Sequence, residues 1–210
     1  MSSPSAVATE TKRLKGAATR DQILSAAARL MHVKGYQSTS LDDVLRESGV
    51  GKGNFYYYFR SKEDLGYAII DRITRTFVDR TLGPAFADVH ADPITQIDAF
   101  LDRVLDSQRQ RNCVGGCVMG NLACELSDVH EGFRQRLVGI FDVWRTHLAD
   151  AVSRGQSLGR IHAGADASRV AQFLVAGLEG AILLSKVTRD ITVMERCVEE
   201  LKRHLTLYRT

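Results

Sequence analysis

The apolar residues of this chain recur at helical spacing over most of its length. On one face of a helix expected over residues 20–34 lie Ile23, Ala26, Ala27, Leu30 and Met31. The same periodicity predicts helices over residues 94–108, 133–152, 168–186 and 192–208, with breaks at 155–164 and 188–190. The sequence has no strand-like alternation of useful length. The pattern therefore predicts an all-helical protein.

Turn and capping signals divide residues 20–50 into two helices. Gly35 ends the first helix, because glycine adopts the left-handed conformation found at helix C-termini. Ser40 and Asp43 have the spacing of a capping box and predict the start of a short second helix. Gly49 ends that helix.

Two more helices are expected to follow at once. The third begins near Lys52 and continues through Phe59, and Ser61 caps a fourth. Along the fourth, apolar residues repeat at Leu65, Ile69, Ile73 and Phe77. Two helices followed by a tight turn and a short helix match a helix-turn-helix motif. In this motif the helix after the turn enters the major groove of DNA.

The distribution of charge supports an anionic partner for the first part of the chain alone. Residues 1–62 hold 10 Lys and Arg against 5 Asp and Glu, whereas the remaining residues hold 18 against 20. An excess of positive charge favours binding to nucleic acid. Residues 1–16, which end in Lys12, Arg13 and Lys15, are expected to form a flexible basic arm.

The third helix carries five consecutive aromatic residues, which cannot all be buried. Phe55 and Phe59 share a face, so Tyr56 and Tyr57 must point elsewhere. Tyrosine hydroxyls suit phosphate oxygens, and glycines at a helix start let backbone N–H groups approach an anion. A partly buried surface with no role in DNA binding is the alternative interpretation.

Residues 20–66 closely resemble the DNA-binding domain of the tetracycline-repressor (TetR) family of bacterial transcription regulators. The resemblance is carried by Gly35-Tyr36, Thr39-Ser40-Leu41-Asp42-Asp43-Val44, Ser48-Gly49-Val50-Gly51-Lys52-Gly53-Asn54-Phe55-Tyr56-Tyr57-Tyr58-Phe59 and Ser61-Lys62-Glu63-Asp64-Leu65. Tyr58 is a departure, since many members have His there. The resemblance implies a homodimer with a DNA-binding domain over residues 17–64. It also implies a helical ligand-binding and dimerisation domain over residues 65–210.

The resemblance also implies the residues that touch operator DNA. It places Thr39 and Lys62 on backbone phosphates, Lys52, Gly53, Asn54 and Tyr57 at base edges or nearby phosphates, and Tyr56 and Tyr58 on the sugar-phosphate strand. Asn54 and Lys52 are the best candidates for base reading, because amide and ammonium groups can address adenine and guanine edges.

The most apolar stretch, Val170–Leu184, must be covered on several sides. It is too short for a membrane span and is interrupted by Gln172 and Glu179, so no membrane partner is expected. Two interpretations stay open for its small residues Ala171, Ala176, Gly177, Gly180 and Ala181: a monomer core, or a subunit interface with the last helix. A palindromic operator favours the two-fold dimer.

The four cysteines are expected to be reduced thiols in the cytoplasm, because the sequence begins without a secretory signal. Cys113 and Cys117 are separated by three residues, which is neither the CxxC redox spacing nor a standard zinc-ligand spacing. Cys124 and His130 are further potential ligands, but their spacing matches no standard metal site. No metal and no cofactor are predicted.

The segments Gly116–Leu122 and Glu179–Lys186 resemble a subgroup of TetR-like repressors that respond to reactive electrophiles, unsaturated acids or oxidants. In those relatives the cysteine matching Cys117 begins a helix, and the lysine matching Lys186 projects toward it. A helix N-terminus and an ammonium group favour the reactive thiolate. Cys117 and Lys186 are therefore effector candidates, with Trp144 as a pocket wall; a buried, inert Cys117 and a core Trp144 are the alternatives.

The expected function is that of a cytoplasmic, homodimeric repressor released from a palindromic operator by a small effector, with no catalytic residues. Two alternatives stay open. One is a structural DNA-binding protein that responds to no effector. The other is a thiol enzyme using Cys117 with His130 or His147, although no sequence context places these residues together.

Overall fold

The computed structural model describes residues 4–210, with side chains from residue 16 onward, as two compact units. The first unit extends to Arg72 and the second runs from Ile73 to Thr210, so the boundary lies inside helix α4. Every regular element of the described residues is helical, apart from an isolated bridge between Ile161 and Arg209. The all-helical prediction is confirmed.

The first unit contains α1 (Pro4–Lys34), α2 (Leu41–Ser48), α3 (Lys52–Tyr58) and most of α4 (Lys62–Phe77). Its turns follow the expected capping chemistry. Gly35 and Gly49 have φ angles of 86° and 66°, where a residue with a Cβ is strained. Ser40 and Asp43 form the capping box, and Asp64 N–H donates to Ser61 Oγ at 3.1 Å.

A small apolar core holds the first unit together. Among its fully buried side chains are Ile23, Val44, Phe55 and Leu65, each from a different helix. Gln22 Nε2 also donates to the Ser48 carbonyl at 2.6 Å, which ties α1 to the end of α2. Each helix therefore contributes to the position of α3.

Helix α1 differs from the expectation at its beginning. Residues 1–16 were expected to be a flexible arm, whereas α1 begins at Pro4 and residues 1–3 lie outside the described residues. The physical reason lies in composition, because Ala, Glu, Lys, Arg and Leu are strong helix formers and occupy most positions from 6 to 15.

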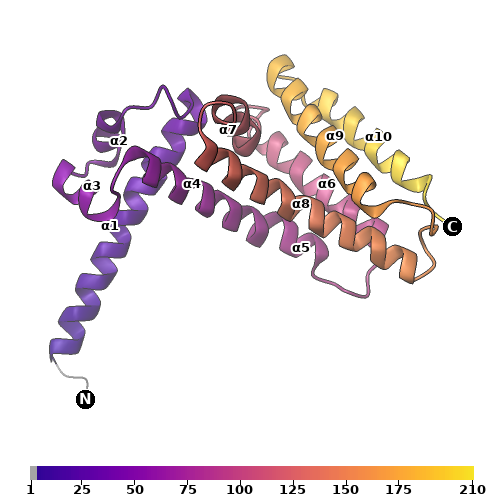
Figure 1. Cartoon of the computed structure of the whole chain (residues 1–210), viewed down its shortest axis with the longest axis horizontal. Coiled ribbons are helices and arrows are strands. Elements are labelled where there is room, and N and C mark those ends of the chain that lie inside the picture. Colours follow the sequence, from indigo (N-terminus) through magenta and orange to yellow (C-terminus); the bar gives the residue numbers. More distant parts are fainter. Residues whose placement is uncertain (1–3) are drawn as a thin grey trace. The chain divides into compact units, whose positions relative to one another are not determined.

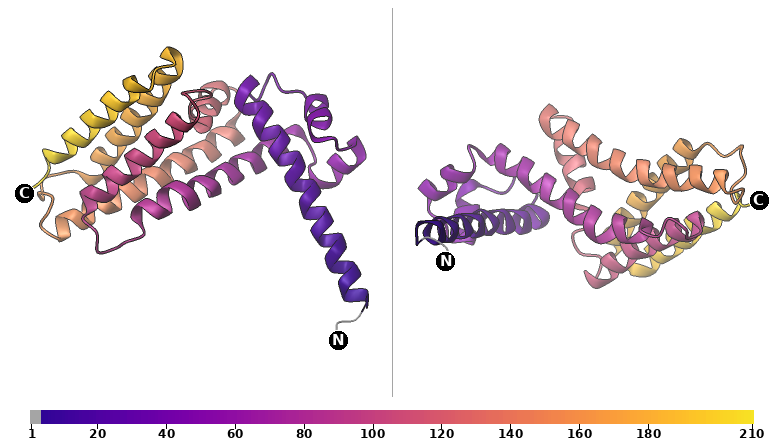
Figure 2. Two further views of the ribbon diagram at one scale, coloured as in Figure 1. Left: turned by 180° about the vertical axis from the view of Figure 1, so that it is seen from behind. Right: turned by 90° about the horizontal axis from the view of Figure 1, so that it is seen from below.

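In the second unit, α6 (Pro93–Gln110), α8 (Glu131–Ser157), α9 (Ala167–Thr188) and α10 (Ile191–Thr206) pack in a ring (Figures 1 and 2). Helix α8 contacts α6 and α9, and α10 contacts α9 and α6. Helix α7 (Val118–Leu126) packs on α8, while a π-helical turn (Val78–Leu82) and α5 (Gly83–Phe86) precede α6. Neither α7 nor the π-helical turn is apparent from apolar periodicity.

Helix α8 continues past the expected break at residue 155. Gly155 lies inside this helix. A larger residue would not fit at this position, because its Cβ would lie 2.5 Å from Ile161 Cδ1. This glycine therefore makes room for the following loop and does not end the helix.

Helix α9 is longer than the apolar stretch from which it was predicted. Its 22 residues are long and apolar enough to cross a membrane by length and composition, so the expectation that the segment is too short is wrong. A core helix passes the same test, and α9 packs against both α8 and α10. Of the most apolar 18 residues of α9, 44% are buried inside the protein.

Candidate functional site

The short helix α3 is anchored by one buried face. Phe55 and Phe59 are 0% and 1% exposed, and their ring centroids lie 5.7 Å apart. Arg20 of α1 lies over the Phe59 ring, 5.1 Å from its centroid. This anchoring directs the other side chains of α3 outward.

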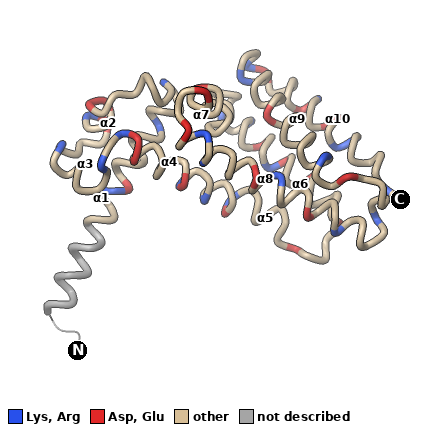
Figure 3. Tube along the Cα trace, in the orientation of Figure 1, with Lys and Arg blue, Asp and Glu red and all other residues tan. Residues whose placement is uncertain are grey.

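The outward side chains include most of the predicted DNA contacts. Lys52, Gly53 and Asn54 in the first turn are exposed, and Tyr56 and Tyr57 are 49% and 80% exposed. An exposed helix edge with amide, ammonium and phenol groups has the chemistry to contact bases and phosphates. Figure 3 shows Lys and Arg interspersed with Asp and Glu along the described helices.

Two of the predicted DNA contacts also lie against the protein itself. The Tyr58 ring meets Tyr57 edge-on at 4.8 Å, and its hydroxyl lies 3.3 Å from the position of a Cβ on Gly16. Lys62 Nζ donates to the Gln37 carbonyl at 3.3 Å and lies over the Tyr36 ring. Lys62 and Tyr58 therefore border the exposed edge of α3.

Thr39 departs from the predicted phosphate contact. Its side chain is 0% exposed, and its hydroxyl donates to the Gly35 carbonyl at 2.7 Å. The turn that precedes α2 uses this hydroxyl internally. We therefore leave the Thr39 side chain out of the DNA interface.

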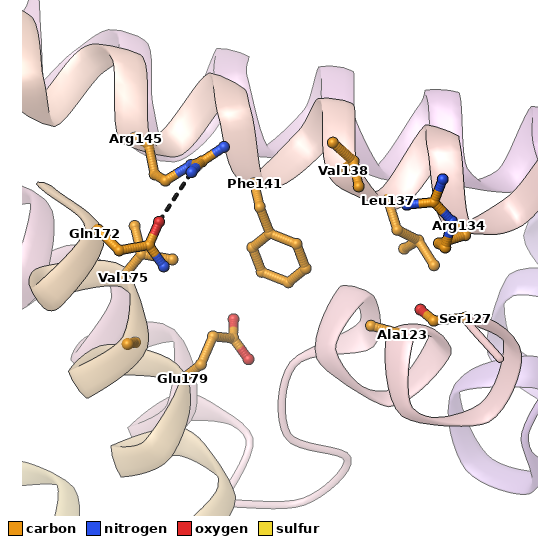
Figure 4. Close-up of a pocket in the computed structure, with 11 residues that line it drawn as sticks. Ala123, Ser127, Arg134, Leu137, Val138, Phe141, Arg145, Gln172, Val175 and Glu179 are labelled. Carbon is orange, nitrogen blue, oxygen red and sulfur yellow. Dashed lines mark hydrogen bonds between the residues drawn. The ribbon is translucent and has the colours of Figure 1, made fainter. Parts of the chain in front are cut away.

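In the second unit, a pocket of about 290 Å³ opens between α7, α8 and α9 (Figure 4). Its wall consists of Ala123, Ser127, Arg134, Leu137, Val138, Phe141, Arg145, Gln172, Val175, Ala176 and Glu179. Arg145 Nη1 donates to Gln172 Oε1 at 2.9 Å, and Arg134 pairs with Glu131 at 2.6 Å. A mostly apolar cavity with a few polar groups is the common form of a small-molecule site.

Cys117 lies at the N-terminus of α7 as expected, but its environment differs from the prediction. Its Sγ accepts a hydrogen bond from Gly120 N–H at 3.4 Å, and the carboxyl group of Glu179 lies close to the thiol. Burial, followed by the charge and hydrogen bond of Glu179, raises the pKa of Cys117. The expected acidification of this thiol is therefore wrong for this conformation.

Lys186 approaches the same loop without being the partner of the thiol. Its Nζ donates to Asn121 Oδ1 at 2.9 Å, and Asn121 Nδ2 donates to the Gly115 carbonyl at 2.7 Å. A Cβ on Gly116 would lie 2.9 Å from Lys186 Cδ. Arg111 is also near the thiol: burial lowers the pKa of its guanidinium group, and the nearby Cys117 opposes that shift.

Trp144 packs in the core and is absent from the pocket wall. It is 2% exposed and stacks on Phe77, with ring centroids 4.4 Å apart and planes inclined by 16°. Phe100 meets it edge-on at 6.1 Å. Phe141, whose ring centroid lies 5.9 Å from that of Trp144, is the aromatic residue that lines the pocket.

The cysteines do not assemble with other ligands. Cys113 is buried, Cys124 is exposed and Cys197 is partly buried. Among the described side chains, no group of three or more His, Cys, Asp or Glu residues has an arrangement that could hold a metal ion.

The anchored α3 with its exposed polar edge defines a helix-turn-helix DNA-binding protein. Residues 23–69 match the model for bacterial regulatory proteins of the tetR family, and residues 93–201 match the model for a tetracyclin repressor-like C-terminal domain. The chain therefore belongs to the TetR family of transcription regulators. These proteins bind operator DNA, have an effector-binding C-terminal domain and are not enzymes.

Individual relatives agree with this assignment. The chain is 33% identical to the transcriptional regulator AcuR of Cereibacter sphaeroides over 154 residues, which cover 73% of this chain and 70% of AcuR. A TetR regulator of Chloroflexus aurantiacus is 31% identical with a TM-score of 0.84, covering 91% of this chain and 96% of that structure. The reduced form of Escherichia coli NemR is 26% identical with a TM-score of 0.80, covering 88% of this chain and 95% of that structure.

Proposed function

We propose that this protein is a homodimeric, cytoplasmic repressor that leaves a palindromic operator when a small effector occupies the pocket between α7, α8 and α9. The observation that carries the DNA-binding part is the exposed edge of α3 opposite Phe55 and Phe59. In this proposal residues 17–64 are the DNA-binding domain, and residues 65–210 bind the effector and dimerise. Lys52, Asn54 and Tyr57 contact the operator bases. The sugar-phosphate backbone of the DNA is contacted by Gly53, Tyr56, Tyr58 and Lys62.

The test is selection of bound sequences from a random DNA pool. A two-fold dimer should select inverted repeats whose half-sites are spaced to match successive major grooves. Binding that shows no sequence preference over random competitor DNA would instead indicate a structural DNA-binding protein.

The dimer is supported by an exposed apolar face on α9. Phe173, Leu183, Leu184 and Val187 are 47–74% exposed and recur at helical spacing on this helix. A groove of about 480 Å³ adjoins this face and is lined by α9 and α10, with Phe173, Leu201 and Leu207 as its apolar residues. Exposed apolar surface of this kind is typical of subunit interfaces.

The glycines of α9 have different roles within this face. A Cβ on Gly177 would lie 2.7 Å from Leu201 Cδ2 of α10, so this glycine serves packing within the protomer. Gly180 has nothing within 4 Å of its Cβ position. The open space beside Gly180 can therefore be filled by a side chain of a second protomer.

Replacing Gly180 with Leu is expected to weaken the dimer without harming the protomer. The protomer has room for the side chain, whereas overpacking a closed interface costs about 1–3 kcal/mol. Sedimentation should show a dimer dissociation constant about ten times higher than that of the parent. Gly139→Leu on α8 is the matched control, because its Cβ position also has nothing within 4 Å. A Gly180→Leu dimer as tight as the parent would move the interface elsewhere.

For the effector, we propose a thiol-reactive electrophile that modifies Cys117. Support comes from the position of Cys117 beside the pocket residue Glu179. Bulk added at the start of α7 favours a conformer whose recognition helices no longer match the operator, which is a shift between pre-existing states.

Cys117→Ser should bind the selected operator normally and no longer respond to an electrophile. In the parent, alkylation should lower operator affinity by about 5–150-fold, the usual range of coupling between sites. Gel shift before and after treatment with acrylamide measures the response, and Cys124→Ser is the control with an exposed thiol removed. Release of DNA from Cys117→Ser as complete as in the parent would assign the response to another group.

A further inference from the structure

The thiol of Cys117 lies beside the carboxyl group of Glu179, a residue that lines the pocket between α7, α8 and α9. Cys117 precedes the first turn of α7, and Glu179 reaches it from the middle of α9. Glu179 lines the pocket, and its carboxyl group lies close enough to the Cys117 thiol to raise the pKa of that thiol. The Glu179 carboxyl group is therefore near both the Cys117 thiol and any molecule bound in the pocket.

The close approach of Glu179 depends on Gly120. A Cβ on Gly120 would lie only 2.5 Å from Glu179 Oε2 and 3.5 Å from Cys117 Cβ. Any other residue at this position would push the carboxyl group away from the helix. The absence of a side chain at Gly120 thus places Oε2 beside the thiol.

The other oxygen of Glu179 is available to the pocket. Oε1 is buried and has no hydrogen-bond partner among the described residues. Figure 4 shows the carboxyl group directed into the space between Phe141 and α7. An unsatisfied buried oxygen is costly, so it favours a ligand that brings a hydrogen-bond donor or a proton.

The electrostatics of the pair allow a proton to move without creating a second buried charge. Burial raises the pKa of Glu179, and the hydrogen bond from Cys117 opposes this shift. Transfer of the thiol proton to Glu179 converts thiol and carboxylate into thiolate and carboxylic acid, so the pair keeps one negative charge. Arg111 interacts with Cys117 and can balance that charge.

We propose that Glu179 is the general base that accepts the Cys117 proton when the thiol adds to a neutral α,β-unsaturated carbonyl compound in the pocket. The inference rests on the proposed function of Cys117 as the site of modification. The other charged groups facing the pocket are the guanidinium groups of Arg134 and Arg145 on α8, which remain protonated at all pH values of interest. Beyond the pair, Lys186 on α9 is bonded to Asn121.

The step is balanced within the pair and the ligand. The S–H bond breaks and its proton goes to Glu179, while Sγ forms a bond to the β-carbon and the alkene electron pair moves to the α-carbon and carbonyl. Glu179 then returns the proton to the α-carbon, which leaves a thioether and a regenerated carboxylate. A carboxyl group whose pKa is raised by burial is a stronger base than an exposed one and suits this task.

The experiment measures the alkylation rate of each cysteine by acrylamide, using mass spectrometry of the full-length protein from pH 5 to pH 9. In the parent, the Cys117 rate should rise as Glu179 ionises and then level off. Cys124, an exposed thiol, is the internal control for reactivity that does not depend on Glu179. If Cys117 stays unmodified while Cys124 reacts, the proposed function of Cys117 fails, and the role of Glu179 fails with it.

Glu179→Gln should lower the Cys117 rate at pH 7 at least about tenfold and remove the plateau, while the Cys124 rate is unchanged. Asp128→Asn removes an exposed carboxylate beyond α7 and should change neither rate. Gly120→Ala keeps the charge of Glu179 but displaces its carboxyl group, so it should also slow Cys117. A Cys117 rate in Glu179→Gln that is equal to or higher than in the parent would overturn the proposal, because Glu179 would then only suppress the thiolate.

Discussion

Replacing Phe55 with Ala is expected to unfold the DNA-binding unit. The Phe55 side chain is 0% exposed and lies edge-on to Tyr56 and against Phe59. Loss of a buried phenylalanine costs about 3–5 kcal/mol, which is a large part of the stability of a unit this small. Thermal unfolding followed by circular dichroism should show an early transition that the parent lacks, together with loss of operator binding.

Tyr57→Ala is the matched comparison on the same helix. Tyr57 is 80% exposed, so its removal should leave the unfolding temperature near that of the parent. Operator binding should still weaken, by about 1–3 kcal/mol for a good base contact. If both variants unfolded alike, or if Tyr57→Ala bound DNA as tightly as the parent, the orientation of α3 proposed here would be wrong.

Trp144→Ala is expected to destabilise the second unit by about 3–5 kcal/mol, because it opens a cavity between Phe77 and Phe100. Phe77 is the last residue of α4, so the cavity also loosens the end of the helix that continues into the DNA-binding unit. Circular dichroism during urea unfolding measures the change without relying on tryptophan fluorescence.

Trp144→Phe is the control for this prediction. It keeps an aromatic ring against Phe77, and the Trp144 Nε1 it removes has no hydrogen-bond partner among the described residues. The variant leaves a smaller cavity than Trp144→Ala and should therefore lose clearly less stability. A similar loss in both variants would show that the indole itself, and not aromatic packing, stabilises this part of the core.

The helix-turn-helix unit was predictable from sequence because its signals are local. The capping box at Ser40 and Asp43, the left-handed Gly49 and the shared face of Phe55 and Phe59 all act within four residues along the chain. Thr39 was misplaced because its burial depends on how the turn packs, which a motif does not show.

The pocket was less predictable, because its contacts join distant parts of the chain. Lys186 was expected to project toward the Cys117 thiol, whereas it bonds to Asn121, and the carboxyl group near the thiol is that of Glu179. Trp144, as an aromatic residue on a helix face, fits core and pocket equally well in sequence. Only the three-dimensional packing separates it from Phe141.

The loop between α6 and α7 has a strict length requirement. Asn112 and Cys113 both have positive φ angles. The hydrogen bonds that hold the loop include Cys113 N–H to the Gln108 carbonyl, Arg189 to the Cys113 carbonyl, and Asn121 to the Gly115 carbonyl. Inserting or deleting one residue here would break this register and rotate Cys117 away from Glu179. Relatives that share the thiol–carboxyl pair should therefore also have eight residues between the positions of Gln108 and Cys117.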